Sequence, residues 1–255
     1  MNKKKIIIGA RGSKLAVKYA ELAIREIKKF YNGKIELKKI VTKGDRVLNR
    51  RTSDIGGKGE FVKNIEKELI AKKIDIAVHS LKDIPYEETP GLIIKTFLKR
   101  NSPKEVLISK NNLSFEKLKK NSIIGTSSFR REFQLKVMRP DLKFKLIRGN
   151  IDSRIKKIYE KKYDAIILAK AGLKSLKMTS LITQEFDCDK IIPSAGQGVI
   201  SLQSRKNDNK INKLLEKVND KNTEIRAKTE RKVLKILKGD CSTAVVFIHS
   251  LRKKN

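Results

Sequence analysis

Residues 74–85, with the sequence IDIAVHSLKDIP, indicate both the fold class and the position of a candidate site. The first five of these residues are mostly apolar and β-branched, which favours a short buried strand over residues 74–78. Polar side chains then crowd together from His79 to Asp83, and Pro85 prevents a helical continuation. A buried strand that opens into a polar loop is typical of open α/β sheets, which bind their ligands at that end of the strands.

The polar loop places an acid directly beside a base. Asp83 next to Lys82 predicts a carboxylate that gives and takes protons, with the neighbouring ammonium group tuning its pKa. The alternative is a surface ion pair that happens to follow a strand. The stretch by itself leaves both interpretations open.

The charge of the chain is strongly unbalanced. It has 255 residues, enough for one large domain or two ordinary ones, and 61 Lys and Arg against 28 Asp and Glu give a net charge of +33. Such an excess suggests nucleic acid, an anionic membrane surface or acidic small molecules as partners. However, 46 of the 61 cations are lysines spread along the whole chain, and only 5% of residues are aromatic, so stacking platforms for single strands are scarce. We therefore take the arginines as the more informative cations.

The cysteines and the apolar runs limit the class of protein. Cys188, Cys241 and two histidines far apart in sequence form neither a disulfide framework nor a metal-ligand cluster. Cys241 follows Gly239 at the expected end of a helix, so it is either a reactive thiol in a turn or a partly buried bystander. The apolar run at residues 6–10 is too short for a signal-peptide core, and no run approaches membrane-spanning length. The sequence predicts a cytoplasmic protein with no metal and no membrane partner.

Several predicted strands end in small residues and cations. Residues 5–8 read as a strand, residues 9–13 as a glycine-containing turn and residues 14–30 as a helix, with Ser13 able to cap the helix and Arg11 at its mouth. Because a helix N-terminus favours an anion, a carboxylate or phosphate is expected here, although a simple capped turn is the alternative.

The same design recurs after a short strand at residues 122–124. Three hydroxyl residues, Thr126, Ser127 and Ser128, precede Arg130 and Arg131 in the opening turn of a helix. Adjacent residues point about 100° apart on a helix, so we expect one arginine to face a ligand and the other an inter-lobe contact.

A third cationic strand end follows residues 143–147, where Arg148 and Gly149 precede Arg154 in the next helix. No G-x-G-x-x-G motif is present, so dinucleotide binding is not supported. The repeated pattern favours a ligand with several negative charges. Residues 46–59, which include Lys58, have little apolar periodicity and are predicted to be either a flexible linker or an active-site lid.

These motifs, taken in this order, resemble the hydroxymethylbilane synthase (porphobilinogen deaminase) family. The matching stretches run in collinear order from residue 11 to residue 241: residues 11–16, 42–45, 56–59, 77–85, 125–131, 148–150 with Arg154, 171–173, 196–198, 226–231 and Cys241.

The resemblance implies an α/β fold with two periplasmic-binding-protein-like lobes and a small α+β C-terminal domain. Residues 1–97 plus 192–206 are expected to form lobe 1, residues 98–191 lobe 2, and residues 207–255 the C-terminal domain with the cofactor cysteine. That domain is expected to be truncated, because the chain ends 14 residues after Cys241. Ser175 and Gln203 stand where the family usually has an arginine and a glutamate, and Asp240 where it usually has a glycine.

The resemblance also implies a transferase that deaminates four porphobilinogen molecules and joins them head to tail into hydroxymethylbilane, on a dipyrromethane primer attached through Cys241. The protein is expected to be a monomer with a small-molecule substrate and no nucleic-acid partner. The implied catalytic residues are Asp83 and Lys82. The implied cofactor-binding residues are Cys241, Asp83, Lys82, Thr126, Ser127, Ser128, Arg130, Arg131 and Arg148, and the implied substrate-binding residues are Arg11, Ser13, Lys58, Arg148, Gly149 and Arg154. Two alternatives remain: a two-lobed anion-binding protein without catalysis, and a basic nucleic-acid-binding protein.

Overall fold

The computed structural model describes residues 5–42 and 59–237 of the chain. Lys58 and Cys241 lie outside this part, as does most of the predicted loop or lid at residues 46–59. Within the described part, no helix combines the length and the apolar character needed to cross a membrane.

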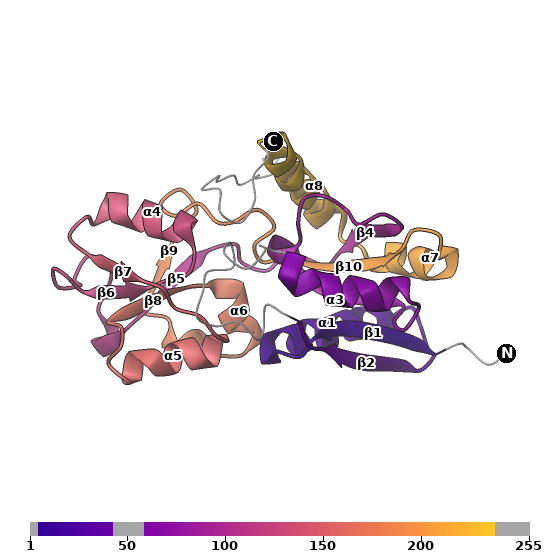
Figure 1. The fold of residues 1–255 in the computed structure, drawn as a ribbon, viewed down its shortest axis with the longest axis horizontal. Coiled ribbons are helices and arrows are strands. Elements are labelled where there is room, and N and C mark those ends of the chain that lie inside the picture. The colour runs from indigo at the N-terminus through magenta and orange to yellow at the C-terminus, as the bar shows by residue number, and fades with distance from the viewer. Residues whose placement is uncertain (1–4, 43–58, 238–255) are drawn as a thin grey trace.

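The described chain forms two α/β lobes side by side (Figure 1). Lobe 1, on the right of the figure, contains a five-stranded sheet in the order β2-β1-β3-β10-β4. Strand β1 runs parallel to β2 and β3, whereas β10 runs antiparallel to β3 and β4. Its elements are β1 (Ile6–Arg11), α1 (Lys14–Lys28), β2 (Ile35–Ile40), α3 (Gly59–Ile70), β3 (Ile76–Ser80), the 3-10 turn η2 (Leu81–Asp83), β4 (Leu92–Phe97), β10 (Ile200–Arg205) and α7 (Asn209–Val218).

Lobe 2 repeats this plan with a second five-stranded sheet in the order β7-β6-β8-β5-β9. Here β6 runs parallel to β7 and β8, and β5 runs antiparallel to β8 and β9. Its elements are β5 (Glu105–Ser109), η3 (Lys110–Asn112), β6 (Ile123–Gly125), α4 (Phe129–Met138), β7 (Lys143–Lys145), α5 (Ile151–Tyr159), β8 (Ala165–Ala169), α6 (Lys170–Ser175), η4 (Thr179–Leu181) and β9 (Gln184–Phe186).

The core of lobe 1 explains why helix α1 lies flat on the sheet. Ile8 of β1 and Ile76 of β3 are fully buried beneath Ala20, Ala23 and Ile27 of α1. The two alanines let the helix approach the strands closely, and the larger side chains fill the space on either side. Helix α7 completes this core, because its buried residues Ile211 and Leu215 belong to the same cluster.

Two chain segments cross between the lobes and are hydrogen bonded to each other. The outgoing segment follows β4, and the returning segment precedes β10. The amide of Asn101 donates to the carbonyl of Gly198 at 2.9 Å, and that of Leu98 donates to the carbonyl of Ile200 at 3.0 Å. Gly198 has a φ of +81°, and a Cβ there would lie 2.6 Å from the carbonyl oxygen of Asn101. Only glycine therefore allows the crossings to approach this closely.

Helix α8 (Lys221–Ile236) packs against these crossings through a buried ion pair. Glu230 is fully buried and binds Arg100 of the outgoing crossing, with Oε1 2.5 Å from a guanidinium nitrogen. The other carboxylate oxygen accepts a hydrogen bond from the amide of Gly196 in the returning crossing at 2.6 Å. One carboxylate thus joins α8 to both segments.

Local hydrogen bonds set the ends of two parts of the chain. The strand expected at residues 74–78 is observed at Ile76–Ser80, because Asp75 uses its carboxylate to accept from the amide of Ile7 at 2.9 Å. The residues after β10 form two helices, α7 and α8, and not one. Asp220 caps α8 by accepting from the amide of Thr223 at 2.8 Å, and Asn219 accepts from the amide of Phe97 at 2.9 Å, so the helix breaks there.

We predict that Glu230→Gln lowers the free energy of unfolding by about 3–5 kcal/mol, because it leaves the buried Arg100 guanidinium without its counter-charge. Urea unfolding followed by circular dichroism measures the change. Lys18→Ala is the matched control: it removes an exposed ion pair with Glu21, and we expect a loss below about 1 kcal/mol. Equal losses in the two variants would contradict the structural role assigned to Glu230.

Candidate functional site

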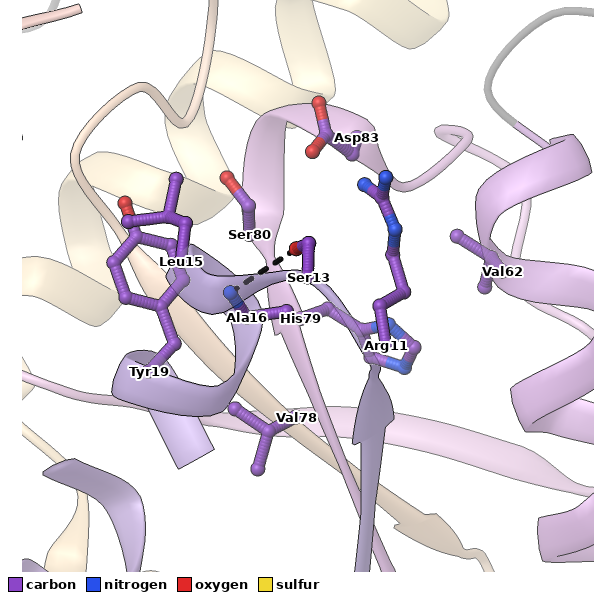
Figure 2. A pocket seen from close by; sticks show the side chains of 10 residues that line it. All are labelled: Arg11, Ser13, Leu15, Ala16, Tyr19, Val62, Val78, His79, Ser80 and Asp83. Carbon is purple, nitrogen blue, oxygen red and sulfur yellow. Dashed lines mark hydrogen bonds between the residues drawn. The ribbon is translucent and has the colours of Figure 1, made fainter. Parts of the chain in front are cut away.

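A pocket lies at the carboxyl ends of strands β1 and β3, where helix α1 begins (Figure 2). It holds about 430 Å³ of empty space, part of it open solvent. The pocket is therefore at the end of the sheet where α/β folds bind their ligands. Its lining residues are Arg11, Ser13, Leu15, Ala16, Tyr19, Val62, Val78, His79, Ser80 and Asp83.

Arg11 and Asp83 reach the same side of this pocket from two different elements (Figure 2). Arg11 is the last residue of β1, and Asp83 closes the turn η2 that follows β3. Ser13 caps helix α1, because its hydroxyl oxygen accepts from the amide of Ala16 at 3.3 Å. Within residues 5–42 and 59–237, no hydrogen bond or ion pair holds the Asp83 carboxylate. Its negative charge is thus directed to the pocket.

Lys82, which precedes Asp83 in the chain, is held by a residue of the segment that returns to lobe 1 before β10. The ammonium group of Lys82 donates to the side-chain oxygen of Gln197 at 3.2 Å. Burial, followed by the nearby charge of Arg131, lowers the pKa of Lys82 to about 8. Lys82 therefore exchanges its proton more easily than a surface lysine does. Tyr19 also lines the pocket, and burial together with the charge of Asp83 raises the pKa of Tyr19 to about 12.

The hydroxyl-rich turn of lobe 2 is a capped strand-to-helix turn, as predicted. Thr126 follows β6 and is buried, and its hydroxyl oxygen accepts from the amide of Ser128 at 3.2 Å. Ser128 caps α4 by accepting from the amide of Arg131 at 3.4 Å. Ser127 lies half-buried between them. Both capping oxygens act as acceptors here, so their O–H groups can still donate to an anion.

One carboxylate that the sequence analysis missed binds both Arg130 and Arg131. Glu105, at the start of β5, is fully buried and pairs with the Arg130 guanidinium through Oε1 and with that of Arg131 through Oε2 at 2.7 Å. Arg130 also donates to the carbonyl of Ile192 at 2.5 Å, so it does contact the returning crossing. Burial raises the pKa of Glu105, but Arg131 and Arg130 outweigh it and lower the pKa to about 2.

The third predicted strand end adds two more cations to lobe 2. Arg148 is buried, and Arg154 donates from Nε to the carbonyl of Gly149 at 2.7 Å. Burial, then the charges of Arg131 and Arg148, lower the pKa of Arg154 to about 10. Arg11 and Asp83 of lobe 1 also act on it, so the charged groups of both lobes face a common space.

Among the described residues, the site carries more positive than negative charge. In residues 5–42 and 59–237, the carboxylates of Asp83 and Glu105 share the space with six cations: Arg11, Lys82, Arg130, Arg131, Arg148 and Arg154. The Nε atom of Arg131 is buried and has no hydrogen-bond partner in the described residues. Such a donor set suits a ligand that brings several carboxylates.

Sequence reasoning missed three contributors to this site. Glu105 read only as the first residue of an apolar strand, although a charged residue that opens a buried run signals a buried ion pair. Tyr19 was not singled out, and the buried hydrogen bond between His79 and Gln203 was missed, because Gln203 was noted only as a departure from the family pattern. Lys58 and Cys241 lie outside the described residues, so the structure does not place them.

Comparisons with known proteins agree with this geometry. A family model described as "Porphobilinogen deaminase, dipyromethane cofactor binding domain" matches residues 6–213. A porphobilinogen deaminase of Exiguobacterium is 43% identical over 244 residues, covering 95% of this chain and 80% of that protein. One of Bacillus cereus is 44% identical over 254 residues, covering 99% of this chain and 82% of that protein.

Similar solved structures concern the fold alone. A YaeC-family lipoprotein of Enterococcus faecalis has a TM-score of 0.52 at 15% identity, covering 90% of this chain and 97% of its own. The periplasmic VFT2 domain of BvgS from Bordetella pertussis has a TM-score of 0.51 at 10% identity, covering 91% and 92%. The folds of both proteins are similar to the two-lobed fold of this chain. The match of the family model over most of the chain, together with these relatives, shows that the chain belongs to the porphobilinogen deaminase family.

Proposed function

We propose that the chain deaminates porphobilinogen and joins four molecules of it head to tail into hydroxymethylbilane. The observation that carries this proposal is the excess of cations around Asp83, at the facing edges of two lobes, in a member of this family. Each pyrrole of the substrate carries an acetate and a propionate. A growing chain therefore brings several carboxylates into the space where the six cations lie.

The arginines and hydroxyls bind and orient these carboxylates. A charge-assisted hydrogen bond contributes about 1.5–3 kcal/mol, and a guanidinium group can hold a carboxylate with two parallel bonds. The buried Nε of Arg131 needs an acceptor, and a substrate carboxylate supplies one. Arg11, Ser13, Lys58, Arg148, Gly149 and Arg154 are the residues we assign to the substrate. Glu105 holds Arg130 and Arg131 rigid before the ligand arrives.

Asp83 is the group we assign to the chemistry. When porphobilinogen loses ammonia, its methylene-pyrrole portion becomes a cation. A carboxylate directed at the pocket stabilises that charge as it develops and accepts and returns protons. Lys82 supports these transfers, because a pKa of about 8 keeps both its protonated and neutral forms accessible near neutral pH.

The family model carries the name of the dipyrromethane cofactor, and the donor set of the site fits that group. When bound, it supplies a pyrrole carbon to which the first substrate is joined. We propose that Cys241 holds it covalently and that Lys82, Asp83, Thr126, Ser127, Ser128, Arg130, Arg131 and Arg148 bind it. Its acidic side chains need the same guanidinium and hydroxyl donors that the structure gathers around Arg131.

We also infer a cytoplasmic monomer that binds neither nucleic acid nor membrane, because its relatives are named for an enzyme that acts on a small molecule. Residues 1–97 with 192–206, residues 98–191 and residues 207–255 are its proposed domains. The sheet order supports the first two, since β10 joins the sheet of β1–β4. Helix α7 falls within the bounds of the proposed third domain, but it packs in the lobe 1 core and belongs to the buried cluster of that lobe.

We predict that Asp83→Asn lowers the rate of hydroxymethylbilane formation by about 10²–10⁴-fold while the protein stays folded. The amide keeps the shape of the side chain but removes the charge that stabilises the cation. Ammonia release and product absorbance measure the effect. Asp187→Asn is the control, because it removes an exposed carboxylate paired with Lys104, away from the pocket. A folded Asp83→Asn protein that releases ammonia at the control's rate would contradict the role.

We predict that Cys241→Ser abolishes the covalent cofactor, whereas Cys188→Ser retains it. Cys188 is a poor nucleophile, because burial raises the pKa of its thiol. Intact mass spectrometry of the wild-type protein and both variants, with the colour reaction for dipyrromethanes, gives the answer. This measurement also tests the proposed function: a wild-type protein without the adduct would favour an anion-binding protein that performs no catalysis. An adduct lost only in Cys188→Ser would reverse the assignment.

A further inference from the structure

A chain of hydrogen bonds links Thr89, in the loop before β4, to His79, which lines the pocket. The hydroxyl of Thr89 donates to one carboxylate oxygen of Glu66 at 2.8 Å. The side-chain nitrogen of Gln203 donates to the other oxygen at 2.8 Å, and the side-chain oxygen of Gln203 lies 3.1 Å from Nε2 of His79. His79, Gln203 and Glu66 are 6%, 1% and 8% exposed. Solvent therefore does not compete for the two bonds that Gln203 makes, whereas the bond from Thr89 is only partly buried.

The direction of this chain is fixed by Glu66. An ionised carboxylate only accepts hydrogen bonds, so the amide nitrogen of Gln203 has to face Glu66. The amide oxygen of Gln203 then faces His79, and Nε2 of His79 has to be the protonated nitrogen. The lone pair of the neutral ring consequently sits on Nδ1. A residue on β10 thus determines which form of the ring lies in the pocket wall.

The charges around His79 oppose one another. Glu66 on α3 and Asp83 on η2 favour an imidazolium, and Arg11 on β1 disfavours it. Burial exceeds all of these effects and lowers the pKa of His79 from 6.5 to about 4. Between those two values the unfolded chain binds the proton and the folded chain does not, so this group lowers stability as the pH falls from 6.5 towards 4. At neutral pH the ring is uncharged.

We propose that Gln203 is a positioning residue of the site, which links Glu66 to His79 and holds the imidazole as its neutral Nε2–H tautomer in the wall of the pocket that Asp83 also lines. The inference rests on the proposed function in one respect. A fixed neutral ring adds no further cation to Arg11 and Lys82 around Asp83, so it does not add to the charge that opposes the cation developing on the substrate. The carboxylate of Asp83 thus remains directed to the substrate.

The tautomer can be read directly in the cofactor-loaded protein by ¹⁵N nuclear magnetic resonance. The chain has only two histidines, and the spectrum of His249→Gln assigns the signals of His79. In the wild-type protein we expect a protonated Nε2, an unprotonated Nδ1 and no titration of His79 between pH 6 and 9, limits set about 2 units or more above its pKa. An Nδ1–H tautomer, or a charged ring in this range, would overturn the proposal.

A pair of variants separates positioning from packing. Gln203→Met keeps the volume but removes the acceptor, and we expect a mixture of the two tautomers and a fall in kcat of about tenfold, with the KM for porphobilinogen within about twofold. Thr89→Val cuts only the outer bond and should leave the His79 signals unchanged. A Gln203→Met protein with the wild-type tautomer would overturn the inference. Because the spectra need no substrate, a wild-type protein that lacks activity would count against the proposed function alone.

Discussion

The ion pair between Glu230 and Arg100 is the interaction on which the arrangement of the two lobes depends. Its carboxylate is fully buried and joins helix α8 to both crossing segments. The same Arg100 donates from Nε to the carbonyl of Gln197 at 3.0 Å, and the side chain of Gln197 accepts from Lys82. The cation beside Asp83 is therefore positioned through the segment that this pair immobilises. A buried pair with both partners saturated resists rearrangement, because separating the charges would leave each one desolvated.

The site follows a second electrostatic rule, which is that fixed anions hold the cations of the ligand-binding surface in place. Glu105 binds Arg130 and Arg131 together, yet its single charge leaves the pair with a net positive charge. Asp83 has no partner of this kind among the described residues. One carboxylate thus organises the donors, and the other remains for chemistry. The difference comes from burial: Glu105 lies beneath the arginines, whereas Asp83 lines the pocket.

Much of the fold could be predicted from the sequence, because its strands are short apolar runs that end in glycines, hydroxyls and arginines. The strand predicted at residues 122–124 is observed at Ile123–Gly125, and Ser13 and Ser128 cap the helices that were expected to begin after these two serines. What the sequence could not supply were contacts between residues far apart in the chain. Glu230 lies 130 positions from Arg100, and Gln203 lies 124 from His79. The spacing of residues within a helix or a strand says nothing about such distant pairs, so only the folded structure shows them.

The close approach at Gly198 has a mechanical consequence for the two lobes. The crossings form a short ladder, in which the amides of Leu98 and Asn101 bind the carbonyls of Ile200 and Gly198. Sliding one crossing along the other, or twisting them apart, would break those bonds. Bending both together would preserve them, and each segment would flex by small changes in several backbone angles. These hydrogen bonds therefore resist sliding and twisting of the two crossings and leave bending as the motion that preserves them. We thus expect relative motion of the lobes to open and close the space between them more than to rotate one lobe against the other.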